Sequence, residues 1–128
     1  MLEIVILGQT PAQKNSKQIA YNKATGKPFI MSSSNVKTWQ NFASIQLLKY
    51  RIKEPLVGRQ EISIMFYVKD NRRRDLDNML TSIQDALMRA GILEDDSWQH
   101  LRISTIDAKI DKENPRAEIT LESIDSIS

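Results

Sequence analysis

Apolar residues recur along this chain with two periods, and the period of each segment predicts which element it forms. Strands are expected where apolar and polar residues alternate or where β-branched residues follow one another; such segments are residues 2–7, 61–68, 101–110 and 117–121. Spacings of three and four predict amphipathic helices, and the segments with these spacings are residues 35–51 and 76–90. Gly91 follows at the position where glycine commonly ends a helix.

The segment between the first strand and the first helix is polar and basic, and it contains one turn pattern. Residues 18–21 and 28–31 flank that turn and predict a short surface hairpin. The expected order is strand, hairpin, helix, strand, helix, strand, strand. It predicts an α+β fold in a single domain over residues 1–128, with two main helices covering one face of a mixed sheet. We expect the last two strands, which a short turn separates, to pair as a hairpin.

Composition narrows the chemistry that this chain can perform. Its 128 residues carry a net charge of +2, so affinity for nucleic acid must come from local clusters of charge. It has no cysteine and a single histidine, His100, which excludes thiolate chemistry and metal sites with several histidines. A metal held by this chain is therefore bound by oxygen, as Mg²⁺, Mn²⁺ and Ca²⁺ are.

The sequence does not indicate a secreted or membrane protein. The first residues form too short and too acidic an apolar run for a signal peptide. No apolar run approaches the ~18 residues that a membrane-spanning helix needs. The lack of cysteine is compatible with a reducing compartment. We expect a cytoplasmic protein without membrane contact and without a small-molecule cofactor.

Three adjacent arginines run directly into two aspartates that are two residues apart. The segment reads Arg72-Arg73-Arg74-Asp75-Leu76-Asp77. Arginines attract phosphate, whereas carboxylates attract divalent cations. In a regular helix the two aspartates would point about 200° apart, but in an extended segment they lie on one side, roughly 6–7 Å apart. The strand–helix junction permits the second geometry, which suits a metal held against a phosphodiester.

A second acidic cluster, residues 94–96, follows the second helix. That helix is roughly 20 Å long, and the six residues 91–96 span at most about 20 Å. Asp96 can therefore reach Asp77 of its own chain only if this segment doubles back nearly straight. In a two-fold dimer with antiparallel helices, Asp96 of one chain would instead meet Asp75 and Asp77 of the other. We hypothesise a metal site completed across a dimer interface.

Simpler interpretations of the same residues stay open. Aspartate is a favoured N-cap residue, so an aspartate here could serve only to start the helix, and the arginines and aspartates could pair with one another. A non-catalytic nucleic-acid-binding module would need no more than the arginines on phosphate. A phosphoesterase for a small substrate is a further alternative, although the sequence has no glycine-rich phosphate loop.

The combined motif resembles the RusA family of Holliday junction resolvases, small proteins encoded largely by bacterial phages and prophages. The resemblance rests on Arg73-Arg74-Asp75-Leu76-Asp77-Asn78 followed by Ala90-Gly91-Ile92-Leu93-Glu94-Asp95-Asp96. It implies a RusA-like fold and a Mg²⁺-dependent endodeoxyribonuclease, with Mn²⁺ as a second usable ion, that works as a homodimer. The implied substrate is a four-way DNA junction, which the enzyme cuts symmetrically by phosphodiester hydrolysis in DNA recombination and repair.

The resemblance also assigns roles to individual residues. The residues that it makes catalytic and metal-binding are Asp75, Asp77 and Asp96. Asp95 is the second choice for the third position. The residues that it places on DNA are Arg72, Arg73 and Arg74, together with two in a loop that resembles a basic loop of the family, Lys14 and Lys17.

One position departs from the family pattern. One member of the family has a lysine important for activity one helical turn after the second aspartate, where this chain has Thr81. A lysine there would supply positive charge to the scissile phosphate. The residues that could replace it are Lys14, Lys69 and Lys109.

Overall fold

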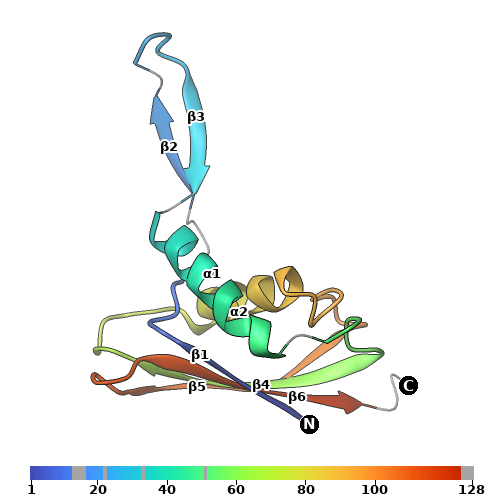
Figure 1. The fold of residues 1–128 in the computed structure, drawn as a ribbon. Helices are drawn as coiled ribbons and strands as arrows, with labels where there is room; N and C mark the ends of the chain where they lie inside the picture. Colours follow the sequence, from blue (N-terminus) through green and yellow to red (C-terminus); the bar gives the residue numbers. More distant parts are fainter. Residues whose placement is uncertain (13–16, 22, 33, 51, 125–128) are drawn as a thin grey trace.

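The computed structural model describes residues 1–12, 17–21, 23–32, 34–50 and 52–124. It has the predicted α+β fold, with two helices packed on one face of a four-stranded mixed sheet (Figure 1). None of the helices described is both long and apolar enough to span a bilayer. The predicted order of elements is confirmed, and the elements are β1 (Leu2–Leu7), β2 (Lys17–Tyr21), β3 (Pro28–Ser32), α1 (Ser34–Leu47), the 3-10 turn η1 (Leu48–Tyr50), β4 (Arg59–Val68), α2 (Leu76–Arg89), β5 (Leu101–Ile110) and β6 (Arg116–Ile124).

The prediction that the last two strands form a hairpin is wrong. The order of strands is β1-β6-β4-β5, so β5 and β6 lie on opposite sides of β4. β5 pairs parallel with β4, whereas β6 pairs antiparallel with β4 and β1. The parallel pairing follows from the crossover through α2, which carries the chain back along the sheet. β6 then pairs with the other edge of β4 and provides hydrogen-bond partners for its buried backbone groups.

The core lies between the helices and β4. β4 alternates strictly, so that side chains such as Ile62 and Phe66 are fully buried towards the helices. α2 buries Ile83 and Leu87 against them, and Trp39 of α1 lies in the core as its position on the apolar face predicts. Burial of each such side chain stabilises the fold by about 1.5–3 kcal/mol. This packing fixes the end of β4 and the start of α2, and the arginine-rich loop joins these two points.

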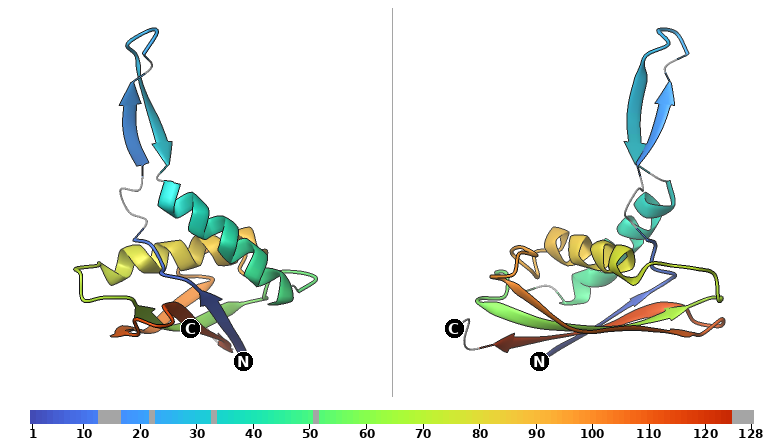
Figure 2. Two further views of the ribbon diagram at one scale, coloured as in Figure 1. Left: turned by 60° about the vertical axis from the view of Figure 1, so that its left-hand side comes forward. Right: turned by 180° about the vertical axis from the view of Figure 1, so that it is seen from behind.

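β2 and β3 form a separate two-stranded antiparallel sheet that stands away from the body (Figures 1 and 2). The predicted surface hairpin is thus confirmed, with Ile19 opposite Ile30 in its register. We call β2, β3 and the turn residues 23–27 the arm. Gly26 has a φ of 70° in the turn, a left-handed conformation that glycine adopts without steric cost.

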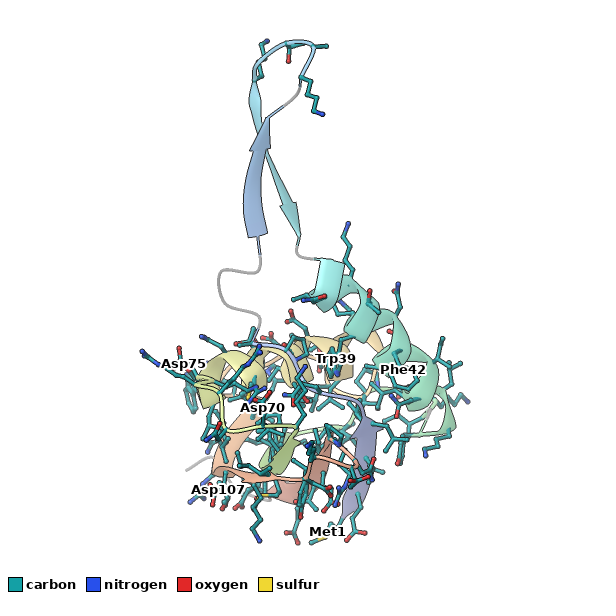
Figure 3. All side chains as sticks on the ribbon, turned by 90° about the vertical axis from the view of Figure 1, so that its left-hand side faces the viewer. Met1, Trp39, Phe42, Asp70, Asp75 and Asp107 are labelled. Atoms are coloured by element: carbon teal, nitrogen blue, oxygen red, sulfur yellow. The ribbon has the colours of Figure 1, made fainter. Side chains whose placement is uncertain are left out.

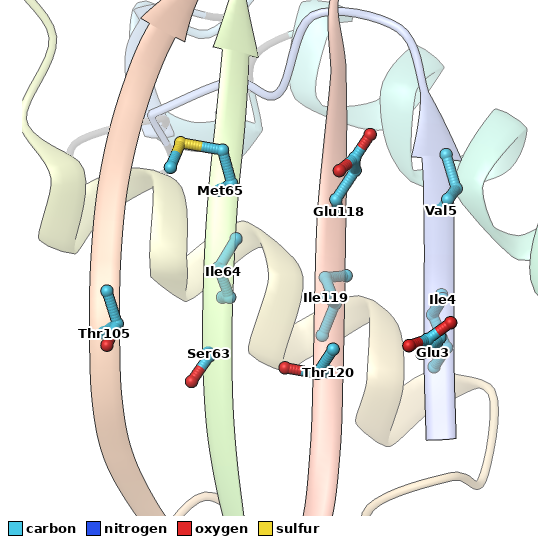
Figure 4. Close-up of a pocket in the computed structure, with 10 residues that line it drawn as sticks. All are labelled: Glu3, Ile4, Val5, Ser63, Ile64, Met65, Thr105, Glu118, Ile119 and Thr120. Carbon is cyan, nitrogen blue, oxygen red and sulfur yellow. The ribbon is translucent and has the colours of Figure 1, made fainter. Parts of the chain in front are cut away.

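The other face of the sheet carries no described helix. A hollow of about 490 Å³ lies on it, where strands β1, β6, β4 and β5 run side by side (Figure 4). Among the described residues that line it, the charged ones are Glu3 and Glu118. Two carboxylates repel a polyanion, so this hollow is not a candidate for a phosphate-binding site.

Candidate functional site

The loop of residues 69–75 joins β4 to α2 and is held at its start by two backbone contacts. The Lys69 amide donates a hydrogen bond to Gln9 Oε1 at 2.9 Å, which ties the loop to the segment after β1. The Asp111 amide donates to the Val68 carbonyl at 2.8 Å, which ties the end of β4 to the turn after β5. Because the loop is anchored where it leaves β4, it presents its side chains in a defined direction, as a binding site requires.

Arg74 shapes this loop from within. Its guanidinium donates to Asp70 Oδ1 at 2.7 Å and to the Asp70 and Arg72 carbonyls at 3.0 and 3.3 Å. The Arg74 side chain is 16% exposed, whereas the side chains of Arg72 and Arg73 are 80% and 91% exposed. The three arginines predicted to bind DNA therefore divide into one that organises the loop and two that face solvent.

The Asp70–Arg74 contact has a consequence that can be measured. The hydrogen bond from Arg74, followed by the backbone hydrogen bond from Arg72, holds the pKa of Asp70 below the ordinary value of 3.8. Because the folded pKa is lowered, the contact stabilises the loop above the unfolded pKa and is lost as pH falls through the folded one. We expect an NMR titration of the Asp70 carboxyl to give a midpoint below 3.8 and Arg74→Ala to raise it. Arg102→Ala, a distant exposed control, should leave it unchanged. A midpoint that does not respond to loss of Arg74 would contradict this assignment.

Asp75 occupies the N-cap position of α2, a role that the sequence left open for either aspartate. Its backbone is extended (φ −88°, ψ 120°), and its side chain makes no capping hydrogen bond. The Asp75 carbonyl accepts hydrogen bonds from the Asn78 and Met79 amides at 3.1 and 3.2 Å. Asp75 Oδ2 accepts from Asn78 Nδ2 at 3.3 Å, and Oδ1 lies 3.8 Å from Arg73. The carboxylate is not used to cap the helix, so it is available for a ligand.

Asp77 lies in the first turn of α2 and is exposed. Its Oδ1 accepts a hydrogen bond from the Asn78 amide at 3.0 Å. Figure 3 shows Asp75 and Asp70 on the helix side of the sheet, with Asp107 towards the opposite side. Both carboxylates lie at the N-terminal end of α2, where negative side chains stabilise a helix through its dipole. Charged carboxylate oxygens are the donors that a hard divalent cation requires.

Asp96 lies in the loop after α2, at the far end of this helix from Asp75 and Asp77 (Figure 1). Fourteen residues make α2 about 21 Å long. Within the described parts of the chain, no group of three or more acidic or histidine side chains is placed to hold a metal. One copy of the chain therefore does not assemble the predicted triad, and the site shared between two copies stays a prediction.

The acidic loop has an internal structure that the sequence did not reveal. His100 Nδ1 lies 2.9 Å from the Ser97 hydroxyl, and Nε2 lies 3.6 Å from Glu94. The Asp96 amide, and then the Ser97 hydroxyl, hold the pKa of Asp95 below its ordinary value. Asp95 is thus engaged in the turn while Asp96 is exposed, which favours Asp96 over Asp95 as a ligand. The spacing of Ser97 and His100 was the available signal for this turn.

A basic groove opens between the arginine loop and the segment after β1. It has a volume of about 460 Å³, and the residues that line it are Gln9, Thr10, Pro11, Ala12, Asn35, Lys69, Arg72, Arg73 and Arg74. Four of them are cations, and none of the described lining residues is acidic. Thr10 is buried, and its hydroxyl has no hydrogen-bond partner among the described residues. This groove is suited to a phosphate group, and the sequence identified its arginines but not Gln9 or Thr10.

The structure describes only some of the lysines that the sequence analysis named. Lys14 lies outside the described residues, and so does the side chain of Lys17, although its backbone begins β2. The Thr81 hydroxyl donates to the Asp77 carbonyl at 3.1 Å and brings no charge to the site. Lys69 lines the basic groove, whereas Lys109 lines a separate hollow on the other side of the arginine loop. Of the two described substitutes for the family lysine, the geometry favours Lys69.

Comparison with known proteins shows the family of this chain. Residues 10–122 match the family model described as endodeoxyribonuclease RusA. A segment of 39 residues is 50% identical to the crossover junction endodeoxyribonuclease rusA of Enterobacteria phage HK97, and it covers 30% of this chain and 32% of that protein. The family match includes β4, the arginine loop, α2 and the acidic loop. The chain therefore belongs to the RusA endodeoxyribonuclease family.

Proposed function

We propose that this protein is a Mg²⁺-dependent endodeoxyribonuclease that resolves four-way DNA junctions as a homodimer, in the recombination and repair of DNA in the cytoplasm. The observation that carries the proposal is the position of Asp75 and Asp77 directly after a groove lined by four cations. Cations bind the phosphodiester backbone, and carboxylates bind a metal beside it. Membership of the RusA family supports the same chemistry and substrate.

The metal would be held by Asp75 and Asp77 of one subunit together with Asp96 of the partner subunit. The donors fit this group in part: two carboxylates lie at the start of α2, and their oxygens suit Mg²⁺ or Mn²⁺. A bound divalent ion activates water and neutralises charge on phosphate. Arg72 and Arg73, exposed beside these carboxylates, would bind and orient the DNA backbone. Contacts of this kind position a nucleic acid without reading its sequence, so selectivity for junctions would come from dimer geometry.

The edge of the sheet at β5 supports the dimer that this site requires. β5 is an edge strand of ten residues, and long unpaired edges favour pairing with another chain. Ile103 and Ile110 pair with the buried residues Ile62 and Val68 of β4, so they lie on the helix side of the sheet. They are nevertheless 49% and 60% exposed. An apolar strip thus follows this edge beside α2.

A two-fold axis at the β5 edge would make the two copies of α2 antiparallel. The start of one α2, with Asp75 and Asp77, would then lie beside the end of the other, which leads to Asp96. This is the arrangement that the spacing of the acidic residues requires. The same symmetry suits a four-way junction, whose arms are themselves related by a pseudo-two-fold axis.

Cleavage of a synthetic four-way junction tests the proposed function. We expect symmetric nicking in Mg²⁺ and in Mn²⁺, and no nicking after a chelator removes the divalent ion, because the carboxylates alone cannot activate water. Binding should persist in the chelator, since the arginines do not need the metal. A linear duplex of the same sequence is the control substrate. Junction binding without nicking in either metal would instead identify a non-catalytic nucleic-acid-binding module.

A further inference from the structure

The charges of this chain are distributed very unevenly along its length. Residues 4–53 contain none of the 16 acidic residues and eight of the 18 lysines and arginines. This segment includes the arm and α1. The whole chain has a net charge of only +2, but residues 4–53 are strongly cationic. A cationic segment of this kind attracts polyanions.

The arm places part of this charge far from the body. Each of its strands has five residues, which corresponds to about 17 Å at 3.3 Å per residue. Lys23 and Lys27 lie in the segment between β2 and β3, and both are exposed. Figure 1 shows this connection at the outer end of the arm. The Lys27 amide donates to the Thr25 hydroxyl at 3.3 Å, which helps to close the turn. The arm thus carries two exposed cations at its outer end, away from the body of the domain (Figure 1).

The base of the arm coincides with the rim of the basic groove. Ala12, on the chain that leads into the arm, and Asn35, just after the arm, both line that groove. The arm therefore begins and ends at the rim of the basic groove, with the cations Arg72 and Arg73 in the groove and the cations Lys23 and Lys27 at the tip. A two-stranded hairpin alone is marginally stable in water, so a separate arm of this kind is expected to gain order from a partner.

We propose that the arm is a second DNA-binding element that lies along one duplex arm of the substrate, with Lys23 and Lys27 on backbone phosphates remote from the cleaved bond. This inference rests on the proposed function and extends it. The groove would hold the phosphodiester next to Asp75 and Asp77, and the arm would follow the helix outwards. Duplex DNA fits the arm better than a protein surface does, because the exposed charges at its tip are all positive and phosphates recur along a duplex.

The test compares two double variants by the salt dependence of junction binding. Lys23→Ala/Lys27→Ala should reduce the slope of log K against log[salt] by about 3.6 for the proposed homodimer, because the double change removes four phosphate contacts from its two arms and each contact contributes about 0.9. The matched control is Lys49→Ala/Lys53→Ala. It removes two exposed lysines that are also four residues apart in the cationic segment 4–53, but that lie at the other end of α1 from the arm. The control should change the slope by much less.

The outcomes separate the arm from the proposed function. If the wild type does not nick junctions but the arm variant still lowers the slope, the arm proposal stands and the nuclease proposal fails. If the wild type nicks junctions and both double variants give the wild-type slope, or equal reductions, the arm proposal is overturned. Light scattering tests whether the arm instead binds a second copy of the chain. A smaller oligomer for the arm variant, together with an unchanged slope, would show that it does and would overturn the proposal.

Discussion

Replacing Asp77 with asparagine is expected to lower the rate of junction cleavage about 1000-fold. A bound divalent ion contributes several kcal/mol of transition-state stabilisation, and each ~1.4 kcal/mol corresponds to a factor of ten in rate. Asparagine keeps the size of the side chain but removes the charge that attracts the ion. Junction binding should be retained or become tighter, because a negative charge beside phosphate is lost. The measurements are single-turnover cleavage and equilibrium binding of the same labelled junction.

Two controls distinguish this role from a purely structural one. Asp77 lies in the first turn of α2, where a negative charge stabilises the helix by about 0.3–1 kcal/mol. Thermal unfolding of the variant should show a loss of no more than this. Asp107→Asn makes the same chemical change at an exposed position of β5 and should leave cleavage intact. Normal cleavage by Asp77→Asn, with only a small loss of stability, would reduce the aspartate to a helix-stabilising residue.

Mixing two inactive variants is expected to restore activity if the site is shared between subunits. In a heterodimer of Asp75→Asn and Asp96→Asn chains, one site would receive both of its altered residues and the other site would be intact. Random mixing makes half of the dimers mixed, each with one of two sites active, so nicking should recover to about one quarter of the wild-type level. Nicked rather than fully resolved junctions should accumulate, because each mixed dimer cuts one strand.

The matched control mixes Asp75→Asn with Asp77→Asn chains. Both changes lie on the same side of the proposed interface, so no combination of these chains restores a complete site. Heterodimers must be verified by two different affinity tags before cleavage is measured. Absence of rescue in verified Asp75→Asn/Asp96→Asn heterodimers would show that each chain builds its own site, and the acidic loop would then have to move towards the start of α2.

The sequence predicted the elements better than their pairing. Periodicity is local, so the ten-residue β5 and the helix that ends before Gly91 were both recognisable. Pairing is decided by long-range packing: the crossover through α2 delivers β5 parallel to β4, and β6 then takes the opposite side of β4. A short turn between two strands suggests a hairpin, but here the turn passes the end of β4, where Asp111 donates to Val68.

The candidate site was partly predictable for a similar reason. Adjacent charges such as Arg72 to Asp77 are visible in the chain, and their approximate position at a strand–helix junction followed from the flanking patterns. The different roles of the partly buried Arg74 and the exposed Arg73 depend on the path of the loop, which residue types do not specify. The contribution of Gln9 depends on a contact between segments 60 residues apart.

The hydrogen bond between the Lys69 amide and Gln9 has a further consequence. The geometry of the basic groove and the length of the arm depend on different segments of the chain. The basic groove lies where β1 and β4 end, and the hydrogen bond from the Lys69 amide to Gln9 Oε1 joins the segments that follow these two strands. The reach of the molecule along its substrate is set by a hairpin inserted beyond that hydrogen bond. A change in the length or charge of the arm therefore leaves the position of Lys69 beside Gln9 in the basic groove unaltered.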